Sequence, residues 1–140
     1  MVSTPYPYPP HQSDFEDWTA PEILAKAEFD ETADVYSFGV ILSELITRKL
    51  PYQGIPDSVI SHRVITGTLR PAIPQDAPMA LRSPAMQCLE GDHRKRPSFR
   101  DLAEKLQVAQ RQLVEEERTS TRIIDVERML SRSKVGLDFR

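Results

Sequence analysis

The longest apolar run of the chain, ADVYSFGVILSELI from Ala33 to Ile46, constrains the fold more than any other feature. Its apolar residues fall on every side of a helix, whereas a surface helix carries a single apolar stripe. The run therefore predicts a central helix enclosed by other elements, with Thr32 as a cap at its start and Pro51 beyond its end. The apolar residues of the run are Val35, Tyr36, Phe38, Val40, Ile41, Leu42, Leu45 and Ile46.

Two further helices are predicted after this run. Residues 57–66 carry a modest apolar stripe that ends at Gly67, and residues 79–89 form a third helical pattern with Pro84 inside it. Because proline removes a backbone hydrogen bond from a helix interior, we expect a kink or a break at Pro84. The proline-punctuated residues 69–78 are predicted to form a connecting loop.

A fourth helix is predicted to begin at Ser98, which together with Asp101 resembles a capping box. Apolar residues then recur at spacings of three and four until the charged stretch EEER, residues 115–118, ends the pattern. A separate amphipathic segment after Thr121 is interpreted as a docking helix or a frayed tail. Since no segment alternates polar and apolar residues, the predicted fold class is all-α. The two apolar patterns consist of Phe99, Leu102, Leu106, Ala109 and Leu113, and of Ile123, Val126, Met129 and Leu130.

The charge balance and the single cysteine exclude several kinds of function. The net charge is −3 and basic residues are mixed with acidic ones, so no cationic stripe points to nucleic acid or an anionic membrane. Cys88 alone cannot form an internal disulfide or a cysteine-based zinc site, and is interpreted as a small buried side chain. No leader pattern and no apolar stretch of about 18 residues occurs. We expect a soluble cytoplasmic protein that binds neither nucleic acid nor membrane.

The first 17 residues are predicted to form a proline-rich disordered arm that favours polyproline II. The stretch PYPYPP, from Pro5 to Pro10, also fits a ligand of an SH3 or WW domain, although prolines equally mark linkers. The histidines His11, His62 and His93 share no spacing typical of a metal site or a general base, so no metal site is predicted.

Four stretches occur in an order typical of one enzyme family: WTAPEIL (18–24), ADVYSFGVILSELITRKLPYQG (33–54), GTLRPAIP (67–74) and CLEGDHRKRPSF (88–99). Together they resemble the large helical lobe of a eukaryotic protein kinase. A single motif such as Ala-Pro-Glu is weak, but four in order at fitting spacings are specific. The stretch ELITRKLPY is more similar to the tyrosine-kinase-like group than to the tyrosine kinases. The stretch HQSDFED differs from the residues that precede the Ala-Pro-Glu segment in both groups. Whether the acceptor is Ser/Thr or Tyr therefore stays open.

The resemblance divides the chain into a proline-rich arm (1–17), a partial kinase domain (18–112) and a charged tail with an amphipathic helix (113–140). It implies that Glu22 and Arg96 form a structural ion pair across the lobe; by themselves, they read as two solvated charges. It also implies that Asp34, at the head of the central helix, anchors the backbone of the catalytic loop. The segment on the substrate side would consist of Trp18, Thr19, Ala20 and Pro21.

The chain lacks the motifs that the kinase family uses for phosphoryl transfer. These are a glycine-rich loop over ATP, a strand lysine, the Asp-Phe-Gly aspartate on magnesium, and the Asp and Asn of the catalytic loop. The five glycines are scattered singly, and Asp14 and Phe15 lie too close to Ala20 for an activation segment to intervene. We therefore expect that this chain holds neither ATP nor magnesium and is inactive alone.

Three interpretations follow from the resemblance. The first is a partial kinase domain, either a truncated product or an incomplete gene sequence. The second is a non-catalytic helical module whose uncovered face binds a partner protein or the missing N-terminal lobe, and the third is a pseudokinase-like regulator that binds nucleotide. Tyr36 and Tyr52 read as phosphate acceptors or, by their match to the family, as packing residues. The sequence leaves the oligomeric state open.

Overall fold

The computed structural model describes residues 16–134, and these residues form helices and loops with no strand among them. This confirms the predicted all-α fold class. The polyproline arm predicted for residues 1–17 falls almost wholly outside the described residues. In chain order the elements are the 3₁₀ helix η1 (Glu16–Trp18), α1 (Pro21–Leu24), α2 (Thr32–Thr47), α3 (Asp57–Ile65), α4 (Met79–Cys88), the 3₁₀ helix η2 (His93–Lys95) and α5 (Phe99–Lys134).

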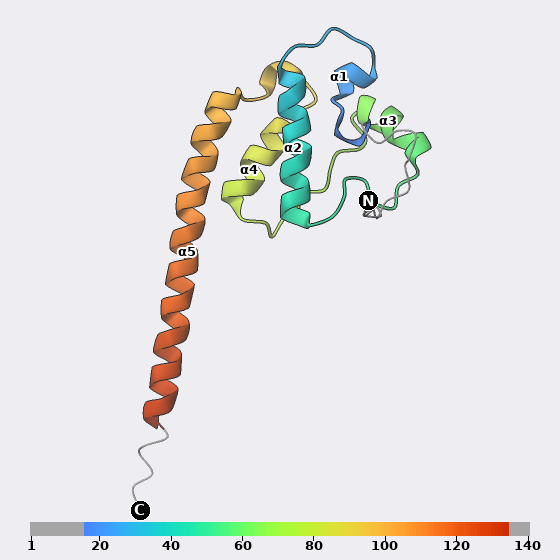
Figure 1. Cartoon of the computed structure of the whole chain (residues 1–140). Coiled ribbons are helices and arrows are strands. Elements are labelled where there is room, and N and C mark those ends of the chain that lie inside the picture. The colour runs from blue at the N-terminus through green and yellow to red at the C-terminus, as the bar shows by residue number, and fades with distance from the viewer. Residues whose placement is uncertain (1–15, 135–140) are drawn as a thin grey trace, which may run out of the picture.

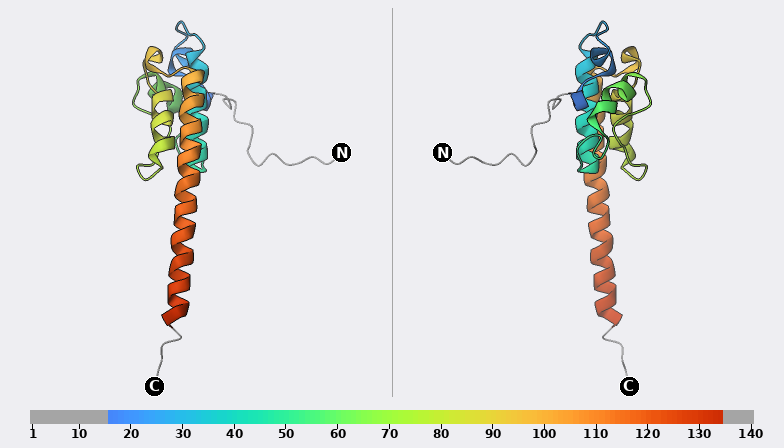
Figure 2. Two further views of the ribbon diagram at one scale, coloured as in Figure 1. Left: turned by 90° about the vertical axis from the view of Figure 1, so that its left-hand side faces the viewer. Right: turned by 90° about the vertical axis from the view of Figure 1, so that its right-hand side faces the viewer.

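The helices gather around α2, and α5 extends far beyond the others (Figure 1). Figure 1 places α4 and α5 towards one side of α2, and α1 and α3 towards the other. Figure 2 shows that α2 stands at the edge of this body rather than at its centre. Two apolar clusters hold the arrangement together: one joins Ala20, Ala33, Tyr36, Val40, Tyr52, Ile60, Val64 and Leu89, and the other joins Val35, Leu42, Ala85, Cys88 and Leu102.

One face of α2 is not covered by the described residues. Ile41 is 43 % exposed and Leu45 is 69 % exposed, whereas Val40 and Leu42 are buried. The prediction of an enclosed helix was therefore wrong for this face, because the neighbouring helices pack only against the other sides of α2.

The start of α2 is capped by a residue that the sequence did not predict. Thr32 is the first residue of the helix, and the Asp30 carboxylate accepts hydrogen bonds from its backbone N–H at 2.9 Å and from its hydroxyl. Glu31, not Thr32, is the N-cap residue, and the Asp30 side chain before it accepts the first N–H of the helix; these hydrogen bonds hold the pKa of Asp30 below its ordinary value. At the other end, Arg48 follows the helix in the left-handed conformation, with φ of 56°.

The helices α3 and α4 follow their predicted ranges. Gly67, with φ of +74°, lies just beyond α3, where a left-handed residue commonly follows a helix. The break predicted at Pro84 is absent, because α4 continues across it. Pro84 and Ala85 are both buried, and Ala85 packs in the cluster that contains Val35 of α2, so packing offsets the backbone hydrogen bond that proline removes.

The helix α5 begins with the predicted capping box. Ser98 Oγ donates to Asp101 Oδ2 at 2.8 Å, and the Asp101 N–H donates to Ser98 Oγ at 3.2 Å. The prediction that the pattern ends at residues 115–118 and restarts as a separate segment was wrong, since α5 is continuous to Lys134. Neither glycine nor proline interrupts it, so the change in apolar pattern marks where the helix leaves the body.

Within residues 16–134, no helix combines the length and the hydrophobicity needed to span a lipid bilayer.

Candidate functional site

A bidentate ion pair joins Glu22 of α1 to Arg96, which lies 74 residues later in the loop before α5. Arg96 Nη1 donates to Glu22 Oε1 at 2.6 Å, and Nη2 donates to Oε2 at 2.9 Å. The Arg96 side chain is fully buried, and the Glu22 side chain is 10 % exposed. The structure thus brings together the two residues that the resemblance to kinases predicted to pair.

The guanidinium of Arg96 also binds other parts of the lobe. Its Nε donates to the Glu90 carbonyl at 2.9 Å, and Nη1 donates to the Thr32 carbonyl at 3.0 Å. Its Cζ lies 5.0 Å from the centroid of the Tyr36 ring, a distance at which the ring attracts a cation. This one side chain therefore connects α1, the start of α2 and the loop after α4.

The pKa of Glu22 predicts that this ion pair is lost in acid. Burial raises the pKa of the carboxyl, but the hydrogen bond and the charge of Arg96 act against burial, and the pKa lies below its ordinary value of 4.5. A carboxyl with a lowered pKa in the folded state stabilises the protein fully above the unfolded pKa, and this stabilisation is lost as the pH falls through the folded pKa.

We expect Glu22→Gln to have a lower free energy of unfolding than the parent chain near neutral pH, and this difference to shrink below pH 4.5. Urea unfolding of both proteins over a range of pH measures the difference. The comparison removes the contributions of Asp30, Asp92 and Asp101, whose pKa values are also lowered, because both proteins retain these residues. A difference that stays constant or widens in acid contradicts the prediction.

The segment predicted to lie on the substrate side is fixed to α2. Trp18 Nε1 donates to Glu44 Oε2 at 2.7 Å, and the Trp18 carbonyl accepts from Ser37 Oγ at 2.7 Å. Ala20 and Pro21 are buried. The N–H of the preceding Thr19 donates to the carbonyl of Glu16 in η1 at 3.0 Å. Sequence reasoning missed Ser37 and Glu44; their signal is that they are polar residues inside a nearly apolar run.

Arg70 is a second organising arginine that the sequence analysis did not identify. Its Nη1 donates to the carbonyls of Val64 and Leu69 at 2.8 Å each, and its Nε donates to the Leu89 carbonyl at 3.2 Å. Its Cζ lies 5.8 Å from the centroid of the Tyr36 ring, so Tyr36 contacts two guanidinium groups. The available signal is an arginine within an apolar, proline-rich loop, where a charge needs several acceptors.

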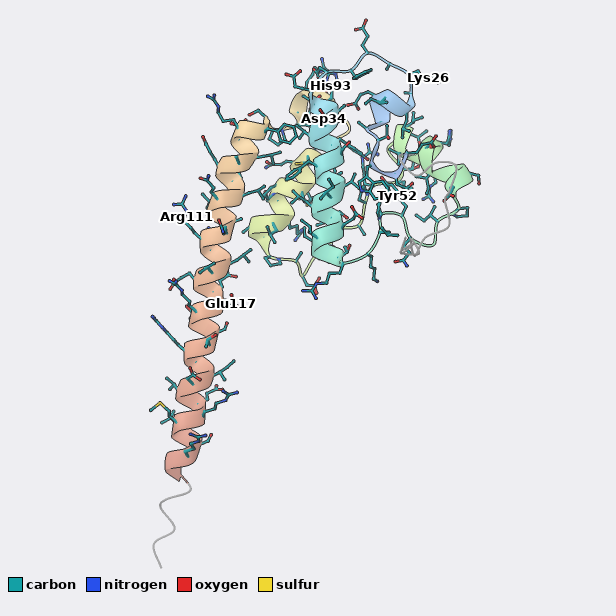
Figure 3. All side chains as sticks on the ribbon, viewed as in Figure 1. Lys26, Asp34, Tyr52, His93, Arg111 and Glu117 are labelled. Atoms are coloured by element: carbon teal, nitrogen blue, oxygen red, sulfur yellow. The ribbon has the colours of Figure 1, made fainter. Side chains whose placement is uncertain are left out.

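The predicted anchor Asp34 lies exposed at the beginning of α2 (Figure 3). Its side chain makes no hydrogen bond or ion pair with the residues that the structure describes, so it takes no part in the Glu22–Arg96 pair. Ile41 and Leu45 follow it at spacings of seven and four, which places all three on one side of the helix. We call Asp34, Ile41 and Leu45 the open face of α2.

Three side chains with reactive groups are buried in the core. Tyr36 is 0 % exposed, Tyr52 is 8 % exposed, and burial raises the pKa of both phenols. Burial also raises the pKa of the Cys88 thiol to about 11, so the thiol is protonated at neutral pH. These observations confirm the packing interpretation of all three residues.

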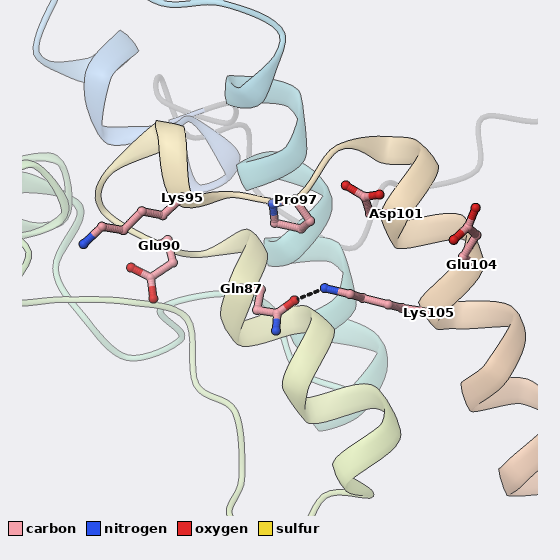
Figure 4. Close-up of a pocket in the computed structure, with 7 residues that line it drawn as sticks. All are labelled: Gln87, Glu90, Lys95, Pro97, Asp101, Glu104 and Lys105. Atoms are coloured by element: carbon pink, nitrogen blue, oxygen red, sulfur yellow. Dashed lines mark hydrogen bonds between the residues drawn. The ribbon is translucent and has the colours of Figure 1, made fainter.

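An open groove lies between the end of α4 and the start of α5 (Figure 4). Acidic and basic side chains are mixed along it, and Lys105 Nζ donates to Gln87 Oε1. The groove therefore provides neither a cationic cradle for phosphate nor a cluster of carboxylates for a cation. Its lining residues are Gln87, Glu90, Lys95, Pro97, Asp101, Glu104 and Lys105.

Elsewhere in the described part of the chain, no three His, Cys, Asp or Glu side chains lie close enough together to hold a metal ion.

Comparison with known proteins identifies the family. Residues 11–106 match the family described as protein tyrosine and serine/threonine kinase, over more than half of the chain. The chain belongs to this kinase family. The part of a kinase domain that it contains runs through α1, α2, α3 and α4, and the match ends inside α5.

Several curated kinases are similar to this segment. The probable serine/threonine-protein kinase roco7 of Dictyostelium discoideum is 36 % identical over 99 residues, which is 67 % of this chain and 4 % of that protein. The dual specificity protein kinase pyk3 of the same organism is 31 % identical over 99 residues, 71 % of this chain and 7 % of that protein. The mitogen-activated protein kinase kinase kinase dlk-1 of Caenorhabditis briggsae is 39 % identical over 98 residues, 70 % of this chain and 11 % of that protein. The chain thus corresponds to a small part of the length of these relatives.

Proposed function

We propose that this chain provides the helical, substrate-side lobe of a cytoplasmic protein kinase of the tyrosine-kinase-like group, and that it transfers no phosphate by itself. The sequence of 140 residues lacks the glycine-rich loop, the strand lysine and the catalytic-loop aspartate. Phosphoryl transfer depends on positioning and electrostatic stabilisation of ATP and magnesium, which a helical lobe without these groups does not supply. The name of roco7 favours Ser/Thr as the acceptor of the complete domain, whereas pyk3 is named a dual specificity kinase.

The observation that carries this proposal is the open face of α2. Ile41 and Leu45 expose 43 % and 69 % of their surface, and Asp34 beside them has no side-chain partner among residues 16–134. Exposed apolar side chains on a helix that is otherwise buried mark a surface that packs against another segment. A carboxylate at the edge of that surface can accept backbone N–H groups of the same segment. We propose that the segment is the catalytic-loop side of a kinase domain.

A chimaeric protein tests this proposal. Residues 16–134 are joined to the part of the dlk-1 protein that precedes its matched segment, and transfer of labelled phosphate from ATP to myelin basic protein is measured. The chimaera is expected to be active and the chain alone inactive. Ile41→Asp in the chimaera is expected to lower activity at least about tenfold, because it places a charge in an apolar contact.

The matched control is Ile65→Asp at the end of α3, because Ile65 is 41 % exposed but does not belong to the open face of α2. This variant is expected to keep the activity of the chimaera. Equal loss in both variants, or a folded but inactive chimaera, contradicts the proposal. Phosphate transfer by the chain alone contradicts the proposed inactivity, whereas its thermal stabilisation by ATP with magnesium contradicts only the expected absence of a nucleotide site.

A second candidate function is a non-catalytic interaction module, which the same exposed residues, Ile41 and Leu45, support. Such a module does not need to fit the rest of a kinase domain. This second function is favoured if the chimaera is folded but inactive, and if its Ile41→Asp variant unfolds at the same urea concentration as the chimaera itself.

A further inference from the structure

The second half of α5 projects away from the body (Figures 1 and 2). Leu102 and Ala109 are buried against the other helices, whereas every residue from 114 to 132 is exposed. In Figure 3, the labelled Arg111 lies just before this extension and Glu117 lies within it. At about 1.5 Å per residue, these 19 residues (114 to 132) extend for about 28 Å. The kinase family match ends at residue 106, before the extension begins.

The composition of this extension does not favour a free helix in water. Thr119, Thr121, Ile123, Ile124 and Val126 are β-branched, which lowers helix propensity. Arg128 and Asp125 form an exposed ion pair at 3.9 Å, and such pairs contribute little. Most helices in proteins are stabilised by packing of an apolar face. A helix of this length therefore needs a surface that covers its apolar side.

Over one heptad, that apolar side has the spacing of a coiled coil. Ile123, Val126 and Leu130 recur at intervals of three and four, and their exposed fractions are 54 %, 54 % and 58 %. In a heptad, Ile123 and Leu130 occupy position a and Val126 occupies position d, so Arg122 is at position g and Glu127 at position e. When two such helices lie parallel and in register, a residue at g faces the residue at e that is five positions later in the other helix.

We propose that this extension pairs with the same segment of a second copy of the chain in a parallel, two-stranded coiled coil. The charges beside the apolar positions favour a second copy of the chain as the partner of this apolar side. In such a dimer, Arg122 of each chain faces Glu127 of the other. In an antiparallel pair, g faces g and e faces e, so Arg122 and Glu127 do not meet. With three apolar core positions per helix, the dimer is weak and dissociates on dilution.

Sedimentation velocity of the 140-residue chain over a wide range of concentration tests the proposal. We expect an equilibrium between monomer and dimer. Ile123→Asn is expected to raise the dissociation constant of the dimer at least about tenfold. Ile65→Asn at the end of α3 is the matched control, since Ile65 is also an exposed isoleucine, and it leaves the dimer unchanged.

A charge exchange tests the parallel register. Arg122→Glu weakens the dimer by placing a carboxylate against Glu127 of the other copy, and the double variant Arg122→Glu/Glu127→Arg restores it. Residues five apart do not face each other within one helix, so the restoration reports on pairing between chains.

A monomer at every concentration, or association that persists unchanged in Ile123→Asn, overturns the proposal. A folded double variant that dimerises no better than Arg122→Glu alone overturns the parallel register. Circular dichroism of each variant shows that the helical body is retained.

Discussion

Arg96→Ala is expected to lower the free energy of unfolding by about 3–5 kcal/mol, the typical cost of removing one partner of a buried ion pair. Without the guanidinium, the Glu22 carboxylate remains nearly buried with no cation beside it, and the carbonyls of Glu90 and Thr32 lose a donor. Because small domains are stable by only about 5–15 kcal/mol, a loss of this size removes a large share of the free energy of unfolding. Urea unfolding followed by circular dichroism measures the change.

Arg94→Ala provides a matched control in the same loop. Arg94 also pairs with a carboxylate, that of Asp92 at 3.0 Å, but its side chain is 78 % exposed. Water solvates the charge that remains when one partner of an exposed ion pair is removed. We therefore expect this variant to unfold at nearly the same urea concentration as the parent chain. If Arg96→Ala is no less stable than Arg94→Ala, burial of the Glu22–Arg96 pair does not hold the lobe together.

Local patterns in the sequence predicted most of the helices, because they depend on neighbours in the chain. The apolar run of α2, the left-handed Gly67 after α3 and the Ser98–Asp101 capping box are such features. The open face of α2 was not predicted, since an apolar side chain shows a preference for burial but not which segment covers it. Likewise, the change of pattern at residues 115–118 was taken as a helix end, although nothing there breaks a helix.

The candidate site depended much less on local patterns. Glu22 and Arg96 are 74 residues apart, and only the resemblance to kinases indicated that they pair. Ser37, Glu44 and Arg70 were missed because they bind groups that folding brings close. Such contacts depend on how the helices pack, which no spacing along the chain encodes.

Gly39→Ala is the second variant for which we expect a large effect, and it reports on the packing of α2 against α4. A Cβ at this position would lie 2.5 Å from the Cβ of Cys88 and 3.1 Å from the side chain of Leu89. Alanine gains about 1 kcal/mol over glycine in a helix interior, whereas overpacking a core costs about 1–3 kcal/mol. The contact involves a Cβ attached to the backbone of α4, which no rotamer change moves. We therefore expect a net loss of up to about 2 kcal/mol, measured by urea unfolding.

The partner of this contact can be varied to test its cause. Cys88→Ala keeps the Cβ. In that background, Gly39→Ala is therefore expected to lower the free energy of unfolding by as much as in the parent chain. Cys88→Gly removes the Cβ, and the cost of Gly39→Ala is expected to fall there by at least about 1 kcal/mol. If Gly39→Ala instead stabilises the chain, as helix propensity alone predicts, then α2 and α4 do not approach this closely. The loop after α4 carries Arg96, so this close approach also sets the position from which Arg96 reaches Glu22.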